Sequence, residues 1–153
     1  MLVICHGNIC RSPFAAALLG ARLPALELRS AGLHAGDGNP ADPVAARCAE
    51  RLGVSLVEHR SRRVDDELLA WSQLILAMQG SHLAELDRFG RGVRRRARLL
   101  GAFLPEPPHL LEDPWGHPEP VFDAVFARIR EAVEVLALRI EAASVAAPAR
   151  RAG

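Results

Sequence analysis

Residues 1–13 read MLVICHGNICRSP, an apolar run that leads directly into a polar loop. The leucine, valine and isoleucine at its start are typical of a buried strand, which we place at residues 2–5. Pro13 fits the first turn of a helix with Ser12 as its cap, and we place this helix at residues 12–23. The stretch therefore predicts a strand, a tight loop and a helix in immediate succession.

The loop between this strand and this helix has the composition of an anion site. Its backbone N–H groups can turn inward, and the helix N-terminus adds its positive end. Arg11 supplies a planar guanidinium that can hold two oxygens of a phosphate. Cys5 would face the same anion, and the positive field favours its thiolate, which is the form that attacks phosphorus.

The composition describes an ordinary globular protein. Of 153 residues, 50% are hydrophobic and 24% are charged, and the net charge is +1. We expect a single domain over residues 1–143 and a disordered tail at residues 144–153. The small net charge argues against nucleic acid as a partner, and the lack of a long apolar run argues against a membrane. Since no signal peptide is recognised, the expected location is cytoplasmic.

The cysteines point to neither a disulfide framework nor a metal. Their number is odd, three in all, and Cys48 is far from Cys5 and Cys10 in sequence. No two histidines have the spacing of zinc ligands, so no metal site is expected. Cys48 falls within a helical pattern, where we expect a buried and inert thiol. All 19 basic residues are arginine, a bias that suggests a GC-rich, bacterial genome.

Strand and helix patterns alternate along the chain, which favours a parallel sheet covered on both faces. Further strands are predicted at residues 26–30 and 74–78 and from residue 98. Further helices are predicted at residues 43–52, 65–71, 81–89 and 120–143, with Asp42 and Ser81 as caps. A proline-rich irregular segment should cross to Asp113. The arginine-rich residues 91–98 are either a solvated loop edge or a patch for nucleic acid or an acidic partner.

At residues 5–13 the chain resembles the low-molecular-weight protein tyrosine phosphatases. Their loop reads Cys, a variable residue, Gly-Asn, a variable residue and Cys-Arg-Ser-Pro, and every fixed position is present here. The resemblance implies a doubly wound α/β fold: a four-stranded parallel sheet with helices on both faces. It also implies hydrolysis of phosphotyrosine through a phosphocysteine intermediate, with no cofactor and no metal.

This chemistry also needs a proton donor for the leaving group. The family places its general acid in an Asp-Pro-Tyr segment, which corresponds to Asp113-Pro114-Trp115 here. The resemblance therefore assigns Asp113 as acid and then as base; the alternative is that Asp113 only starts a turn. Trp115 stands where the family has tyrosine and would wall a slot for the phenyl ring, unless it packs in the core.

The remaining loop residues receive substrate-binding roles from the resemblance. Ser12 would donate its hydroxyl to the thiolate, so that the sulfur leaves more easily. Gly7 would let the backbone approach the anion, and Ile9 would form an apolar rim. Asn8 would hold the loop open, with His59 either as one of its partners or simply as a surface residue.

Two further loop residues complete the predicted substrate-binding set. His6 occupies a variable position, where it adds positive charge or packs, and we expect its role to be peripheral. Cys10 follows the nucleophile Cys5 by five residues. In this family such a neighbour can form a disulfide with the nucleophile and protect it from irreversible oxidation.

These residues favour a protein tyrosine phosphatase acting on a phosphotyrosine-containing protein, as a monomer or a weak dimer. Residues 79–83 and 121–123 look nearer to bacterial members, many of which act on tyrosine kinases of exopolysaccharide export. A protein-arginine phosphatase is the alternative, although such relatives carry threonine where this chain has Ile9. An arsenate reductase of the same fold would need cysteines in residues 70–100, which have none. A non-catalytic phosphate-binding module would not need Cys5 and Asp113 together.

Overall fold

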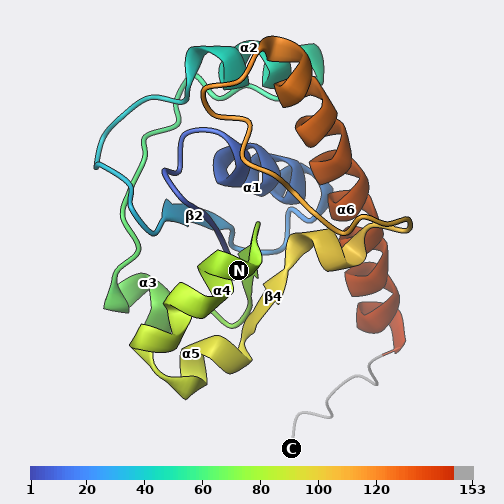
Figure 1. Cartoon of the computed structure of the whole chain (residues 1–153). Coiled ribbons are helices and arrows are strands. Elements are labelled where there is room, and N and C mark those ends of the chain that lie inside the picture. The colour runs from blue at the N-terminus through green and yellow to red at the C-terminus, as the bar shows by residue number, and fades with distance from the viewer. Residues whose placement is uncertain (147–153) are drawn as a thin grey trace, which may run out of the picture.

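The computed structural model describes residues 1–146 and shows a four-stranded sheet between two layers of helices (Figure 1). The strands, all parallel and in the order β2-β1-β3-β4, are β1 (Leu2–Cys5), β2 (Arg29–Gly32), β3 (Ile75–Ala77) and β4 (Ala97–Leu99). The α-helices are α1 (Arg11–Arg22), α2 (Pro43–Arg51), α3 (Asp66–Trp71), α4 (Gly80–Leu86), α5 (Arg91–Arg95) and α6 (Glu119–Ala146). Two 3-10 helices are η1 (Asp87–Phe89) and η2 (Leu100–Phe103). The predicted doubly wound α/β fold is confirmed.

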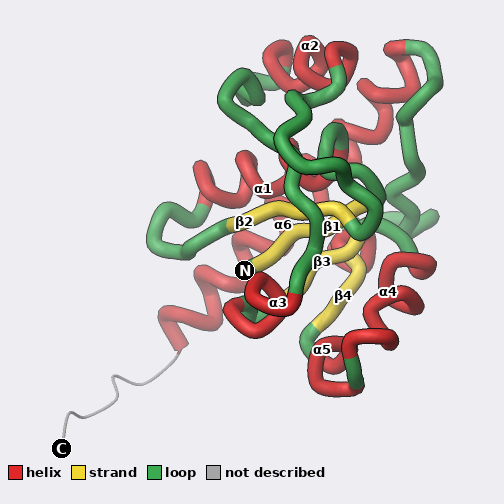
Figure 2. Tube along the Cα trace, turned by 90° about the vertical axis from the view of Figure 1, so that its left-hand side faces the viewer, coloured by secondary structure: helices red, strands yellow, loops and turns green. Residues whose placement is uncertain are grey.

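Successive residues of the central strand β1 face opposite helix layers. Val3 belongs to the core shared with α1 and α6, whereas Leu2 and Ile4 belong to the core shared with α3 and α4. Figure 2 shows the strands between these layers. All four residues of β1 are buried, which explains why its sequence is continuously apolar rather than alternating.

The loop after β1 lies where the winding of the sheet reverses. β1 pairs with β2 on one side and with β3 on the other, so successive connections leave it in opposite directions. In open parallel sheets, ligands bind at this point, beyond the carboxyl ends of the strands. The topology therefore places residues 6–10 at the ligand edge of the sheet.

The second strand lies at residues 29–32, so the prediction of residues 26–30 was wrong at both ends. Its parallel register pairs Arg29 with Leu2 and Gly32 with Cys5. Glycine is required at this last position, because a Cβ on Gly32 would lie 2.6 Å from the carbonyl oxygen of His6. Pairing with β1, rather than local apolar character, sets where β2 ends.

Two caps and one loop were also predicted wrongly. α1 begins one residue before Ser12, whose hydroxyl makes no capping hydrogen bond. α4 begins one residue before Ser81 and has no side-chain cap. Asp42 does cap α2, since its Oδ1 accepts a hydrogen bond from the backbone N–H of Val44 at 2.8 Å. The arginine-rich residues 91–98 form α5 and most of β4 instead of a loop.

The last helix, α6, is the longest, with 28 residues. It reaches Ala146 rather than residue 143, so residues 144–146 of the predicted tail are helical; the rest of that tail lies outside the described residues. α6 packs on α1, where the rings of Phe126 and Phe14 stack with centroids 4.1 Å apart. Within residues 1–146, no helix is both long enough and apolar enough to cross a membrane.

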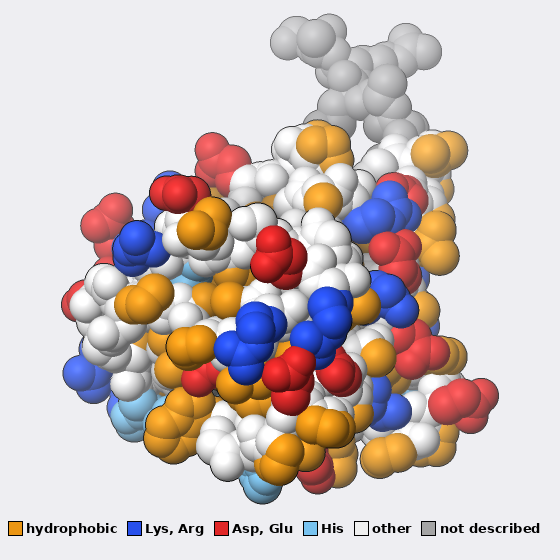
Figure 3. Space-filling model, turned by 90° about the horizontal axis from the view of Figure 1, so that it is seen from above, with side chains coloured by type: hydrophobic (Ala, Val, Ile, Leu, Met, Phe, Trp, Pro, Cys, Tyr) orange, Lys and Arg blue, Asp and Glu red, His pale blue; other side chains and the backbone are white. Residues whose placement is uncertain are grey.

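Ion pairs fasten α2 to the first turns of α6. Arg51 lies 2.5 Å from Glu119 and 2.6 Å from Asp123, and Arg47 lies 3.2 Å from Glu119. Figure 3 views the end of the molecule where α2 lies and shows basic and acidic side chains meeting on its surface. Each exposed pair adds little stability, but together they fix the start of α6, which follows the irregular segment at residues 104–118.

Candidate active site

Cys5 ends β1 and is buried where the polar loop begins. The backbone N–H of Asn8 donates a hydrogen bond to its Sγ at 3.2 Å, and the hydroxyl of Ser12 lies 3.0 Å from the same sulfur. α1 begins directly after the loop, at Arg11. The sulfur therefore lies beside a backbone N–H, a hydroxyl and the positive end of a helix, an arrangement that can bind an anion.

Asn8 holds the loop in shape. Its φ of 55° lies in the left-handed region, which asparagine tolerates better than most residues. Its buried side chain donates to the hydroxyls of Ser12 and Ser30 at 2.9 and 3.0 Å, and accepts from the Arg62 N–H at 2.9 Å. His59 Nε2 donates to the Asn8 carbonyl at 2.6 Å, so this histidine is a partner of the loop, though through the backbone. Burial lowers the pKa of His59, which favours the neutral ring.

Arg11 is 1% exposed, and its guanidinium is held on one side. Nη1 donates to Gln79 Oε1 at 2.9 Å and to the Leu111 carbonyl at 3.1 Å. Nη2 lies 2.5 Å from Asp113 Oδ2. Nε is buried and has no hydrogen-bond partner among residues 1–146. An arginine with an unpaired N–H group can donate a further hydrogen bond to an incoming anion.

Asp113 reaches this arginine from the segment between η2 and α6. Its Oδ2 pairs with Arg11, and its Oδ1 accepts a hydrogen bond from the Trp115 N–H at 3.2 Å. The second contact is the local turn expected of an Asp-Pro segment. Asp113 therefore both starts a turn and faces the loop that carries Cys5.

These groups enclose a cavity of about 20 Å³, which holds roughly one water molecule. It is lined by Cys5, Gly7, Ile9, Cys10, Arg11, Asp113 and Trp115. All three predicted catalytic residues thus share one cavity. The Asp113 carboxylate, paired with Arg11, forms part of the wall of this cavity.

Four of the predicted substrate-binding residues line this cavity: Gly7, Ile9, Cys10 and Trp115. Trp115 is 64% exposed, so the alternative of a core role is wrong. An added Cβ on Gly7 would lie 3.7 Å from Ile9 Cγ1, so packing within the protein does not itself require glycine there. His6 lies outside the lining, with its ring stacked on His34 at a centroid distance of 4.6 Å.

The three cysteines are free thiols, and all are buried. Burial raises the pKa of Cys10, and the nearby Asp42 carboxylate raises it further. Cys10 therefore stays protonated near neutral pH and is a poor nucleophile. Burial also raises the pKa of Cys48 in α2, and the predicted burial of this thiol is confirmed.

Sequence reasoning missed Gln79 and His82. Gln79 lies two residues after the end of β3, and a polar residue near the carboxyl end of a parallel strand beside the loop is the signal that could have found it. His82 in α4 is 2% exposed, and its Nδ1 has no partner among the described residues. Burial, followed by the charge of Arg11, lowers the pKa of His82 to about 4. No sequence signal distinguishes it from a surface histidine.

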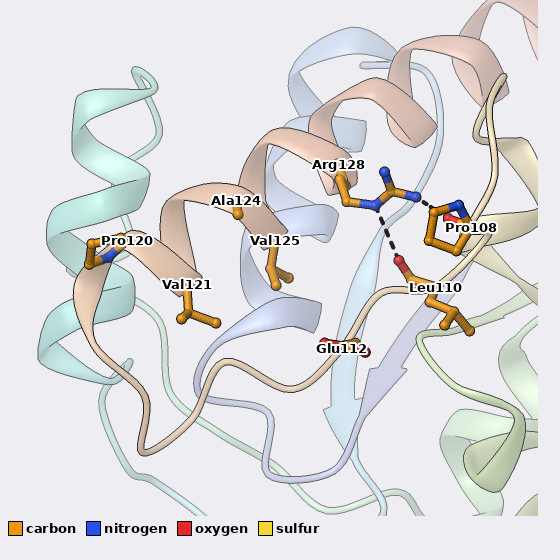
Figure 4. A pocket seen from close by; sticks show the side chains of 8 residues that line it. All are labelled: Pro108, Leu110, Glu112, Pro120, Val121, Ala124, Val125 and Arg128. Atoms are coloured by element: carbon orange, nitrogen blue, oxygen red, sulfur yellow. Dashed lines mark hydrogen bonds between the residues drawn. The ribbon is translucent and has the colours of Figure 1, made fainter.

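The segment that carries Asp113 is tied to α6 by Arg128, which sequence reasoning also missed. Arg128 Nε donates to the Leu110 carbonyl at 3.3 Å, and its Nη2 donates to the Pro108 carbonyl (Figure 4). A groove of about 440 Å³ lies between the segment and the helix. It is lined by Pro108, Leu110, Glu112, Pro120, Val121, Ala124, Val125 and Arg128.

The fold and the site define an α/β protein with an oxyanion-binding cysteine loop at its topological switch point. Residues 1–146 match the family model described as low molecular weight phosphotyrosine protein phosphatase. The low molecular weight protein-tyrosine-phosphatase Etp of Escherichia coli K12 is 36% identical over 140 residues, which cover 92% of this chain and 93% of that protein. The chain therefore belongs to the low molecular weight protein-tyrosine-phosphatase family, and it is a hydrolase of that class.

Solved structures give the same result. The tyrosine phosphatase Wzb from Escherichia coli K30, in complex with sulphate, superposes with a TM-score of 0.86 at 34% identity, covering 91% of this chain and 96% of that one. The arginine phosphatase YwlE from Geobacillus stearothermophilus superposes with a TM-score of 0.89 at 28% identity, covering 98% and 97%. The fold is therefore common to enzymes named for two different phosphorylated residues.

Proposed function

We propose that this protein hydrolyses phosphotyrosine in proteins through a phosphocysteine intermediate. The observation that carries the proposal is the convergence of Cys5, Arg11 and Asp113 on one cavity. A protein that only bound phosphate would need the arginine and the loop amides, but neither a nucleophile nor an acid. Each of the three residues has a separate task in a two-step displacement.

In the first step, Cys5 Sγ forms a bond to phosphorus while the bond from phosphorus to the tyrosine oxygen breaks. Protonated Asp113 gives its proton to that oxygen, so tyrosine leaves as a neutral phenol. Arg11 binds the equatorial oxygens, over which negative charge is spread in the transition state. Trp115 and Ile9, which line the cavity, would contact the phenyl ring.

In the second step, a water molecule attacks phosphorus and the sulfur–phosphorus bond breaks. The Asp113 carboxylate takes a proton from the water and returns to its acid form. Cys5 leaves as a thiolate, which the hydroxyl of Ser12 at 3.0 Å can stabilise by donating a hydrogen bond. Inorganic phosphate is released, and the residues return to their starting state.

The apolar side chain of Ile9 supports tyrosine as the substrate residue, since it offers an aromatic ring contact and no hydroxyl for a guanidinium. The names of Etp and Wzb support the same assignment. A protein-arginine phosphatase is the second candidate, supported by the superposition on YwlE. We further propose that the natural substrate is a bacterial tyrosine kinase of exopolysaccharide export.

The test compares phosphate release from an aryl phosphate and from phosphotyrosine, phosphoarginine and phosphoserine peptides, in the presence of a chelator. Phosphotyrosine should be the best peptide substrate, and Cys5→Ser should abolish release. Preference for phosphoarginine would instead support the second candidate function, a protein-arginine phosphatase. Full activity of the Cys5→Ser variant would contradict the phosphocysteine mechanism.

A further inference from the structure

The segment at residues 85–98 carries a charge that the rest of the chain does not share. It holds six arginines and two carboxylates, so its net charge is +4. The whole chain has a net charge of +1, which leaves −3 for the remaining residues. The small overall charge therefore hides a separation of charge within the molecule, and the field around this segment is positive.

The exposed arginines at the centre of this segment have no carboxylate partner. Among the described residues, no carboxylate oxygen lies within 4.0 Å of the side chains of Arg91, Arg95 and Arg98. Arg98 Nη1 donates to the carbonyls of Arg95 and Ala97, both at 2.8 Å. These acceptors are neutral, so they hold the guanidinium in place without cancelling its charge.

Two flanking arginines have carboxylates only at the limit of an ion pair. Arg88 lies 4.0 Å from Glu85, and Arg94 lies 3.9 Å from Asp87. By contrast, the arginines of α2 lie between 2.5 and 3.2 Å from carboxylates of α6. Exposed pairs at long distance contribute little, so most of the positive charge of the segment is available to an external anion.

This charge lies away from the candidate active site. α5 directly precedes β4 and therefore lies toward the amino ends of the parallel strands, whereas the cysteine loop follows the carboxyl end of β1. Figures 1 and 2 both show α5 at the end of the molecule opposite α2. Within α5, Arg91 and Arg95 are four residues apart and share one face of the helix. Like charges in this arrangement repel each other, and a bound anion would relieve the repulsion.

We propose that this surface docks an acidic segment of a protein partner, a run of aspartate or glutamate residues. We call it the arginine face and define it by Arg88, Arg91, Arg94, Arg95 and Arg98. Carboxylates can accept hydrogen bonds from several of these guanidinium groups at once. A partner held there would leave the cavity of the candidate active site open.

Two observations favour an acidic polypeptide over other polyanions. Within residues 85–98 the structure shows no exposed large apolar side chain, so this surface lacks the stacking platform for bases and the apolar anchor for a membrane. The remainder of the chain is negative and would repel a long nucleic acid or an anionic bilayer that extends beyond the arginine face. A short acidic segment avoids that repulsion.

The chain offers a matched control on another element. Arg130 and Arg139 are exposed arginines of α6, outside the arginine face. Arg91→Ala/Arg95→Ala and Arg130→Ala/Arg139→Ala lower the net charge equally, but only the first double variant reduces the charge of the arginine face. The side chains of Arg91 and Arg95 make no hydrogen bond among the described residues, and alanine is favourable in helices, so the fold should be retained.

The experiment measures the dissociation constant of a fluorescently labelled oligoglutamate peptide by anisotropy, at low and at physiological salt. The parent should bind the peptide, and binding should weaken as salt rises, because exposed charges are screened. At low salt, Arg91→Ala/Arg95→Ala should weaken binding by about fivefold or more, and the double variant of α6 by less than about twofold. kcat and KM for an aryl phosphate should be unchanged in both variants.

No measurable binding of oligoglutamate to the parent at low salt would overturn the proposal, and so would equal losses in the two double variants. Tighter binding of an oligonucleotide of the same charge would assign the arginine face to nucleic acid instead. A parent dimer that dissociates in Arg91→Ala/Arg95→Ala would assign it to a second copy of this chain, which also contradicts the proposal. The inference does not rest on the proposed function, because binding is measured without hydrolysis.

Discussion

Asp113 and Arg11 form a close ion pair at 2.5 Å in the absence of substrate. The carboxylate that is proposed to act as the acid thus occupies one of the donors that a phosphate needs. Under the proposed mechanism, an entering phosphate competes with this carboxylate for Arg11. Substrate binding and placement of the proposed acid should therefore be coupled.

Asp113→Asn should separate these two roles. Turnover should fall by about 10²–10⁴, the usual contribution of a general acid, and most for poor leaving groups, which depend most on protonation. Inorganic phosphate should bind more tightly, because a neutral amide competes less for Arg11. The measurements are kcat across aryl phosphates of different leaving-group acidity and a phosphate titration. A loss of rate that is equal for all leaving groups would argue against the acid role.

Single residues were predictable where their role follows from adjacent sequence. The loop from Cys5 to Ser12 is contiguous, so its anion site could be proposed before any fold was known. Ser12 does not cap α1, whereas its hydroxyl does lie 3.0 Å from Cys5 Sγ; the local sequence is the same for a capping serine and for a serine beside a sulfur. Gln79 was not predictable as a partner of Arg11, since the two residues are far apart in sequence and lie close only because β3 pairs with β1.

At the scale of elements, the segment at residues 104–118 has no regular structure of its own and depends on α6. Arg128 binds two carbonyls of this segment, while the ion pairs of Arg51 hold the start of the helix. These contacts at both ends of an irregular segment hold Asp113 in a defined place.

Arg128→Ala should therefore reduce kcat by about tenfold through misplacement of Asp113, since small displacements of an acid are costly. Phosphate affinity should change little, because Arg11 keeps its own partners. Arg130→Ala is the matched control, as Arg130 is an exposed arginine on the same helix. Equal kcat for the two variants would show that the hydrogen bonds of Arg128 do not position Asp113.

Helices and strands were predicted correctly where the amphipathic or apolar pattern was long, and wrongly where strand pairing sets the boundaries. The run of apolar residues was sufficient to predict β1, and the helical spacing of apolar residues was sufficient to predict α6. The predicted range of β2 was shifted because its few apolar residues do not mark where the strand begins or ends. These ends follow from the register with β1. The proline-rich segment was correctly expected to be irregular, but its attachment to Arg128 could not be foreseen from composition.

For the molecule as a whole, His82 links stability to pH. Burial keeps its pKa near 4 in the folded protein, whereas in the unfolded chain an imidazole has a pKa of about 6.5. Between these values the unfolded state binds a proton that the folded state does not. The free energy of unfolding should therefore decrease as the pH falls through this window, by about 2 kcal/mol between about pH 7 and pH 5.

His82→Asn removes this titration and should flatten the decrease. The measurement is chemical denaturation of both proteins at the two pH values, with the change in unfolding free energy as the readout. Paired carboxylates such as Asp123 lose their own contribution only at lower pH, because the hydrogen bond from Arg51 lowers the pKa of Asp123. An equally steep decrease in the variant would mean that His82 is not the responsible group.

The order of the site along the chain also affects biosynthesis. A ribosome makes Cys5 well before it makes Asp113 and the helix that packs on Phe14. A nascent chain therefore carries the proposed nucleophile for a time without the proposed acid or the covering helix. Under the proposed mechanism, hydrolysis can begin only after the last of these segments has left the exit tunnel, so chains that lack them should be inactive and more open to oxidants.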